Sequence, residues 1–222
     1  MIKKSKTQLV YYVASIAIFI IGAFFIITYA SGYKVDITNR NISQMGMLVV
    51  ETDAKIDLDG KFIGEGKTQL RNLIPGNYEV RLYKEGYQDW TRSFELSPGE
   101  AEIINDAILF KSNIEPSEYK VETNDFFDKL SDKDGLAIDG GEIIQNGSFV
   151  TRLSKLVNGL CWYSDRRYIA YTYENHLKII QIDGTNEITL IEKKSDTPVV
   201  FLNSGRSVVY ESDGKIYRAD IR

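Results

Sequence analysis

Residues 54–63 read AKIDLDGKFI, and this stretch decides the fold of the segment around it. Ile56 and Leu58 alternate with polar residues, as the buried face of a β-strand requires, because successive side chains of a strand point to opposite faces. Asp59 and Gly60 follow at once, and this pair signals a tight hairpin turn since both residues tolerate positive φ. The stretch therefore predicts two antiparallel strands, 54–58 and 61–63.

Four further strands are predicted on either side of this hairpin, and turn signals such as Pro75-Gly76 separate them. Their ranges are 47–50, 78–84, 90–96 and 101–109. Short strands with frequent turns and no helical periodicity are typical of a small β-sandwich, so we expect this fold for the segment.

The segment 46–110 resembles the PEGA domain in residue order and approximate spacing. The residues that carry the resemblance are Gly46, Leu48, Val50, Thr52, Ala54, Ile56, Leu58, Asp59, Gly60, Gly64, Thr68, Leu70, Leu73, Pro75, Gly76, Tyr78, Val80, Gly86 and Tyr87. The chain departs from the family at Asp53 and Gln69, where the family usually has proline, and its name-giving turn is shortened here. The resemblance implies a small immunoglobulin-like sandwich on an exported bacterial protein, with no chemistry of its own.

An uncharged apolar run covers residues 9–30. A helix of this length can cross a hydrocarbon layer of roughly 30 Å while satisfying its own backbone hydrogen bonds. Lys3, Lys4 and Lys6 precede the run, so the positive-inside rule keeps residues 1–8 in the cytoplasm and exports the remainder. We therefore predict a retained, single-pass anchor in the lipid bilayer of the cell membrane.

A cleaved signal peptide is the alternative interpretation, because residues 30–32 read Ala-Ser-Gly, a passable small-residue cleavage site. Signal peptides usually contain only about 7–15 apolar residues, so the length of this run favours the anchor. The polar residues 31–45 show no sustained period, and we expect them to form a spacer between the membrane and the folded segment.

A polar linker is predicted at residues 111–134, and a separate β unit at residues 135–222. Within this unit an apolar pattern recurs, with Asp183-Gly184 and Asp213-Gly214 as hairpin turns. Each matching pair is 39 residues apart: Trp162 and Phe201, Ile169 and Val208, Tyr171 and Tyr210, Leu177 and Ile216. A repeat of about 40 residues with four short strands is typical of β-propeller blades. The unit resembles TolB-type and WD-type propellers, and we expect two to three propeller-like blades.

A closed propeller needs at least about four blades, so the predicted blades cannot close a ring within this chain. Two alternatives follow. Either the sequence is a fragment of a longer product, or the strands form an open arrangement that packs on the PEGA-like segment or on a partner.

Catalytic and metal-binding residues are not predicted anywhere in the chain. His176 is the only histidine and Cys161 the only cysteine, which leaves too few groups for a nucleophilic triad or a structural zinc site. Asp132 and Asp134 invite a calcium interpretation, but their spacing to Glu142 does not fit an EF-hand loop. We therefore expect a protein that is not an enzyme and holds no cofactor.

The net charge of the chain is −4, and since residues 1–8 carry +3, the exported remainder carries −7. A negative surface repels nucleic acid, so we expect no nucleic-acid partner. Aromatic side chains around one turn, Tyr83, Tyr87 and Trp90, are candidates for binding a protein or glycan partner. For Trp90 a position in the core is favoured.

The predicted function is that of a non-catalytic, membrane-anchored extracytoplasmic protein of the bacterial cell envelope. It would act as a structural module or bind an envelope protein or a glycan. The extracytoplasmic arm of a signalling or transport assembly is the alternative, and a cell-wall hydrolase ranks last.

Overall fold

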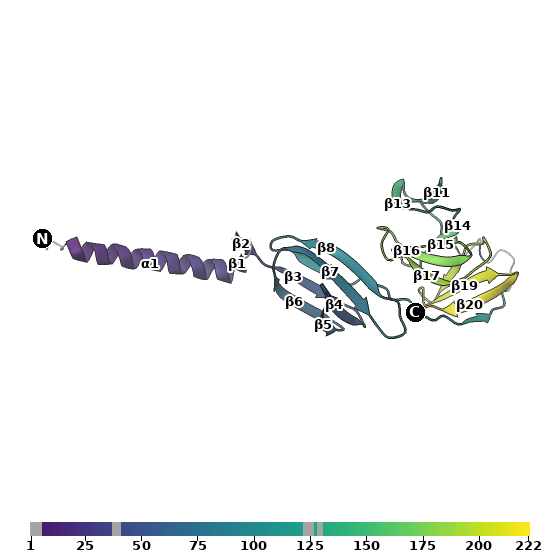
Figure 1. Cartoon of the computed structure of the whole chain (residues 1–222), viewed down its shortest axis with the longest axis horizontal. Helices are drawn as coiled ribbons and strands as arrows, with labels where there is room; N and C mark the ends of the chain where they lie inside the picture. Colours follow the sequence, from purple (N-terminus) through teal and green to yellow (C-terminus); the bar gives the residue numbers. More distant parts are fainter. Residues whose placement is uncertain (1–5, 37–40, 122–126, 128–130) are drawn as a thin grey trace. The chain divides into compact units, whose positions relative to one another are not determined.

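The computed structural model describes residues 6–36, 41–121, 127 and 131–222. Within these residues, one α-helix precedes a chain that is mainly β-strand, which confirms the predicted fold class at this level (Figure 1).

The chain divides into two compact units. The first contains residues 1–80 and 93–106, and the second contains residues 81–92 and 107–222. The tip of the hairpin at residues 81–92 therefore groups with the C-terminal residues. The predicted domain boundaries remain a prediction.

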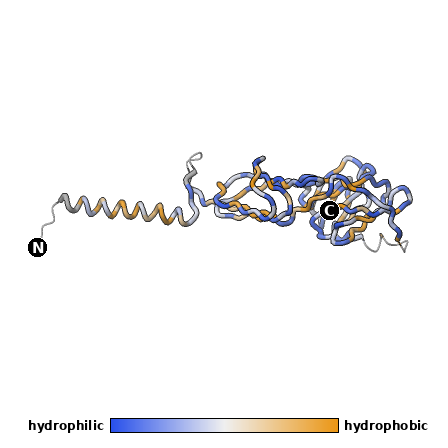
Figure 2. The backbone as a smooth tube through the Cα atoms, turned by 90° about the horizontal axis from the view of Figure 1, so that it is seen from below, coloured by the Kyte–Doolittle hydropathy of each residue, from blue (hydrophilic) through white to orange (hydrophobic). Residues whose placement is uncertain are grey.

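Helix α1 (Lys6–Ala30) confirms the predicted apolar helix. The segment Val10–Ala30 has a mean hydropathy of 2.5 (Figure 2). None of its most apolar stretch is buried against other residues of the chain. Ser15 and Thr28 donate hydrogen bonds of 2.9 and 2.8 Å to helix carbonyl oxygens three and four residues earlier. These hydroxyl groups are therefore paired without water, as a lipid environment demands.

A two-stranded antiparallel sheet follows the helix within the predicted spacer. It consists of β1 (Tyr33–Asp36) and β2 (Asn41–Gln44). The helix ends at Ala30, and Gly32, which has a φ of 79°, lets the chain turn away from the helix axis.

Seven strands form two sheets between residues 46 and 104. They are β3 (Gly46–Val50), β4 (Lys55–Leu58), β5 (Lys61–Glu65), β6 (Thr68–Leu73), β7 (Gly76–Tyr83), β8 (Trp90–Leu96) and β9 (Ala101–Ile104). One sheet has the order β6-β3-β9, with β3 and β9 parallel, and the other has the order β5-β4-β7-β8. The predicted hairpin between β4 and β5 is confirmed, with positive φ at Asp59 and Gly60.

Apolar residues of both sheets fill the interior of the first unit. Leu48 of β3 and Ile56 of β4 are buried, as alternation predicts, and so is Leu96 of β8. Gly46 lets the sheets approach closely, because a Cβ at this position would lie 2.6 Å from the Leu96 side chain. The apolar pattern therefore predicts the core of this unit correctly.

Two strands differ from the sequence-based expectation. Strand β6 was not predicted, because its sequence TQLRNL is mostly polar and partly exposed. Strand β9 ends at Ile104 rather than at residue 109. Ile103 is 55% exposed, and Ile108 is buried in the second unit.

The second unit contains three antiparallel sheets. The first comprises β11 (Leu136–Asp139), β12 (Glu142–Gln145) and β13 (Ser148–Arg152). The middle sheet comprises β14 (Asn158–Trp162), β15 (Tyr168–Tyr173), β16 (His176–Gln181) and β17 (Ile188–Glu192). The last sheet comprises β18 (Val200–Leu202), β19 (Ser207–Ser212), β20 (Lys215–Asp220) and β10 (Pro116–Glu118).

Apolar side chains pack the middle sheet against both of the others. Ile143 of the first sheet shares one cluster with Trp162 and Ile169, while Tyr168 shares a second cluster with Val208 of the last sheet. Strands β19 and β20 begin 39 residues after β15 and β16, so the sequence repeat corresponds to repeated strands. Strand β10 lies beside β20 as β17 lies beside β16.

Candidate functional site

The three aromatic residues predicted to bind a partner differ in their exposure. The ring of Trp90 is fully buried, in agreement with the core position favoured for it, whereas Tyr83 and Tyr87 are half-buried. Cationic groups of the chain already lie over all three rings: Arg92 over Trp90, Arg81 over Tyr83 and Lys84 over Tyr87. A partner role for Tyr83 and Tyr87 remains a prediction.

The turn that carries Tyr87 is bound to residues after the first unit. Gln88 N donates a hydrogen bond of 2.7 Å to Phe110 O, and Ser112 N donates one of 2.9 Å to Gly86 O. Tyr87 forms an isolated antiparallel bridge with Lys111. The turn therefore fixes the start of the segment that leads into β10.

Side-chain contacts hold the same turn against the middle sheet. The Gln88 side chain donates a hydrogen bond of 3.0 Å from Nε2 to Thr189 O in β17. Asn186 makes two bonds to the backbone of Thr91, accepting from its N at 3.0 Å and donating to its O at 2.9 Å. This part of the predicted binding surface is occupied by the chain itself.

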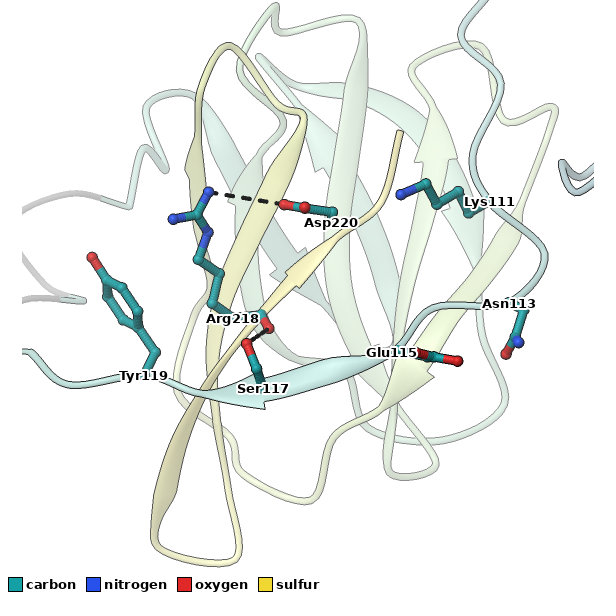
Figure 3. A pocket seen from close by; sticks show the side chains of 7 residues that line it. All are labelled: Lys111, Asn113, Glu115, Ser117, Tyr119, Arg218 and Asp220. Atoms are coloured by element: carbon teal, nitrogen blue, oxygen red, sulfur yellow. Dashed lines mark hydrogen bonds and ion pairs between the residues drawn. The ribbon is translucent and has the colours of Figure 1, made fainter.

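A polar groove of about 600 Å³ opens beside β10 and β20 (Figure 3). Five of its lining residues lie at every second position from Lys111 to Tyr119, a segment that includes β10. The lining residues are Lys111, Asn113, Glu115, Ser117 and Tyr119, with Arg218 and Asp220 from β20. Because the groove combines charged, amide and hydroxyl groups in one concave surface, it is the candidate functional site.

Backbone hydrogen bonds fix the wall of the groove at both ends. Lys111 N donates to Ile221 O at 3.0 Å, and Tyr119 N donates to Ile216 O at 2.8 Å. Between them, Ser117 Oγ donates to the carbonyl oxygen of its partner residue in β20, at 3.3 Å. The segment is therefore held along its length rather than only at one point.

A buried serine positions the two charged side chains of β20. Ser207 is 1% exposed, and its Oγ donates a hydrogen bond of 2.6 Å to Asp220 Oδ1 while accepting one of 3.1 Å from Arg218 Nη2. Arg218 Nη2 and Asp220 Oδ1 lie 3.8 Å apart. Preorganised groups of this kind lose little entropy when a ligand binds.

The charges of the groove balance each other. Lys111 and Arg218 contribute two positive charges, and Glu115 and Asp220 contribute two negative ones. Among the described residues, Lys111 and Glu115 make no ion pair, so their charged groups are accessible to a ligand. In Figure 3 the Asp220 carboxylate lies between the Lys111 and Arg218 side chains.

The groove is not evident from the sequence, because residues 111–134 have the composition of a polar linker. Most residues of the segment are polar, and its few apolar residues do not alternate regularly, so there is no strand signal; Pro116 also argues against a strand in general. The pairing partner in β20 is about 100 residues away and is not evident from local sequence. A contact between residues so far apart in the sequence produces no recognisable pattern in a short stretch of it.

A second hollow of about 1000 Å³ lies at the first sheet and has a largely apolar lining. Ile138, Leu153 and Leu156 contribute its apolar side chains, and Lys155 and Glu174 form an ion pair at its border. Leu156 is 81% exposed.

The residues that the sequence offers for catalysis or metal binding do not line either hollow. Their charges are paired or their side chains are buried. Asp132 and Asp134 both pair with Arg166, and no group of three or more His, Cys, Asp or Glu residues within the described ranges could hold a metal ion. Cys161 is completely buried, and burial raises the pKa of its thiol to about 12. Its reactive thiolate form is therefore negligible at neutral pH.

The comparison with protein families gives a match at residues 45–107, to the PEGA domain. A comparison with curated proteins gave no match. The matched residues agree closely with the predicted segment 46–110 and contain β3 to β9. Residues 45–107 of this chain are thus similar to the PEGA domain, which suggests an extracytoplasmic binding or interaction module.

Proposed function

We propose that this protein is a non-catalytic interaction module of the bacterial cell envelope, anchored in the membrane by α1 and exposed on the outer side. The observation that carries the proposal is the order of the parts. An uncharged helical stretch, Val10–Ala30, is long enough to span a bilayer and precedes a segment similar to a domain found outside cells. Lys3, Lys4 and Lys6 support an orientation with the N-terminus in the cytoplasm.

The second unit supports an interaction role in this proposal. Its three sheets resemble successive propeller blades, since equivalent strands of the middle and last sheets recur after 39 residues and consecutive strands within each sheet pair antiparallel. We interpret β10 as the fourth strand of the last blade. In this arrangement, the blades present one polar and one apolar hollow to partners.

Orientation is tested by labelling single cysteines with a membrane-impermeant maleimide on spheroplasts. Cys161 is buried and its thiol is protonated, so the unsubstituted protein should remain unlabelled and serve as the control. Lys61→Cys, at an exposed position after the β4–β5 turn, should react on intact spheroplasts, and Ser5→Cys should react only after lysis. The reverse pattern would refute the orientation.

Retention of the anchor is tested by carbonate extraction of membranes. The full-length protein should stay in the pellet, because extraction removes only proteins without an inserted helix. Release of a shortened soluble form would show that residues 9–30 are a cleaved signal.

A further inference from the structure

We infer that the polar groove beside β10 and β20 binds a neutral, extended oligosaccharide. The inference rests on the proposed extracytoplasmic function and names the ligand class of one of its surfaces. It follows from the balance of charge in the groove, from the fixed positions of its polar groups and from the structure of its edge.

The charge balance selects against most other ligands. Asp220 and Glu115 repel a polyanion, while Lys111 and Arg218 repel a cation. An apolar ligand would have to strip water from these groups without replacing their hydrogen bonds, which is costly. A neutral ligand that offers many donors and acceptors avoids all three penalties.

Sugar hydroxyl groups match the arrangement of the groove. Each hydroxyl can donate to a carboxylate and accept from a cationic N–H group at the same time. Ser207 fixes Asp220 and Arg218 side by side, so one hydroxyl can bridge their free atoms without rearrangement of the protein. Hydrogen bonds that involve a charged partner are also stronger than neutral ones.

The shape of the groove indicates an extended ligand. Its lining residues follow alternate positions from Lys111 to Tyr119, along a segment tied to β20. The volume of about 600 Å³ lies within the range of ligand sites, which is about 300–1,000 Å³. The half-buried ring of Tyr119, at one end of the lining in Figure 3, offers a surface against which a sugar ring can pack.

The edge of β10 disfavours a peptide that would bind as an added strand. Tyr119 directs its N–H toward β20, and Pro116 has no N–H to offer on the free edge. Proline on an edge strand is a common device against strand addition. The side-chain face rather than the backbone edge is therefore the binding surface.

The inference is tested by isothermal titration calorimetry on the full-length protein in lipid nanodiscs, which avoids detergents with sugar head groups. The probes are the β-1,4-linked tetramer of N-acetylglucosamine and cellotetraose, with a heparin tetrasaccharide and a Lys-Glu tetrapeptide as competitors from other classes. We expect binding of at least one neutral tetrasaccharide and none of the two charged probes.

Two variants then locate the site. Arg218→Gln and Asp220→Asn should each weaken saccharide binding by about tenfold, as expected for the loss of a charged hydrogen-bond partner. Lys215→Gln, on the same strand but outside the groove, is the matched control and should bind normally. Circular dichroism should show that all three variants remain folded.

Three outcomes would overturn the inference: binding of neither saccharide, equal binding by wild type and both groove variants, or preferential binding of the polyanion or the peptide. These outcomes leave the labelling pattern of Lys61→Cys and Ser5→Cys unchanged. A failure of the saccharide-binding inference is thus distinguishable from a failure of the proposed function.

Discussion

The first and the last sheet of the second unit present different surfaces to solvent. At the first sheet, Phe149 and Leu156 are 61% and 81% exposed, and the adjacent hollow is largely apolar. At the last sheet, Arg218 and Asp220 line a polar groove and share a buried serine. In stacked repeat architectures a polar outer face ends the stack, whereas an apolar one still needs cover. The last sheet therefore suits a hydrated ligand and the first suits a protein surface.

The largest loss of stability is expected from removing the side chain that packs the middle sheet against the first sheet. Trp162 is 5% exposed, packs with Ile143 and donates a hydrogen bond of 2.7 Å from Nε1 to Asp134 O. Trp162→Ala should lower the free energy of unfolding by about 3–5 kcal/mol. Urea unfolding measures this loss.

Hydrogen exchange should show which strands lose stability in this variant. In Trp162→Ala the amides of β11 to β13 should lose protection more than those of β19 and β20. Trp162→Phe, which keeps an aromatic ring, is the control and should keep most of the protection. Uniform loss across all three sheets would mean that the first sheet does not depend on this contact.

A buried amine where the middle and last sheets meet makes the free energy of unfolding depend on pH. Lys193 is completely buried, and its Nζ donates a hydrogen bond of 3.0 Å to Thr172 Oγ1 and another to Ser195 O. Burial lowers the pKa of Lys193 from 10.5 to about 8, against the opposing effects of Asp196, Cys161 and Glu211. Folding is therefore penalised by about 3 kcal/mol at pH 7, because the charged amine must be desolvated.

The sign of the effect follows from proton binding. Between pH 8 and 10.5 the unfolded chain holds this proton and the folded chain does not, so the free energy of unfolding should rise with pH. The rise should be absent in Lys193→Met. Urea unfolding of both proteins at several pH values isolates the contribution as a difference, and equal slopes would contradict it.

A smaller effect is expected at the polar groove itself. Ser207→Ala removes the buried hydroxyl that orients Arg218 and Asp220, so each of these charged side chains loses a hydrogen bond. We expect a loss of about 1–3 kcal/mol in the free energy of unfolding. Ser112→Ala, at an exposed position, is the matched control. Thermal unfolding that is the same for both variants would show that Ser207 does not organise the groove.

The smallest change in stability, but a distinct change in association, is expected at the apolar hollow. Leu156→Ser alters an exposed side chain, so the free energy of unfolding should change by no more than about 0.5 kcal/mol. If the apolar hollow contacts a second copy of the chain, Leu156→Ser should reduce self-association, which sedimentation velocity in nanodiscs measures. Lys111→Ser in the polar groove should leave self-association unchanged. If Lys111→Ser reduced self-association and Leu156→Ser did not, the polar groove rather than the apolar hollow would be the contact surface.

Local patterns predict the parts of this fold that depend on local interactions. The alternation of Ile56 and Leu58 and the turn at Asp59 and Gly60 identify β4 and β5, because period and turn chemistry lie within ten residues. The uncharged run identifies α1 for the same reason. The 39-residue repeat identifies equivalent strands, although not how the sheets are completed.

The parts that escape prediction depend on distant partners. Strand β6 is polar and is held by pairing with β3, and β10 is a three-residue strand that contains a proline. The groove needs both β10 and β20, so neither segment alone indicates it. Trp90 shows the converse: the resemblance to PEGA-like sandwiches favours its burial, but the Arg92 side chain over its ring could not be anticipated.

The pairing of β10 with β20 also constrains how the protein is made. Ser117 and Arg218 are 101 residues apart, so β10 leaves the ribosome long before its partner exists. Contacts of such separation close late, since the entropy of the intervening loop must be overcome first. If the chain is exported during synthesis, the last sheet cannot be completed until β20 has crossed the membrane. The polar groove would therefore form only on chains in which β20 has reached the same side of the membrane as β10.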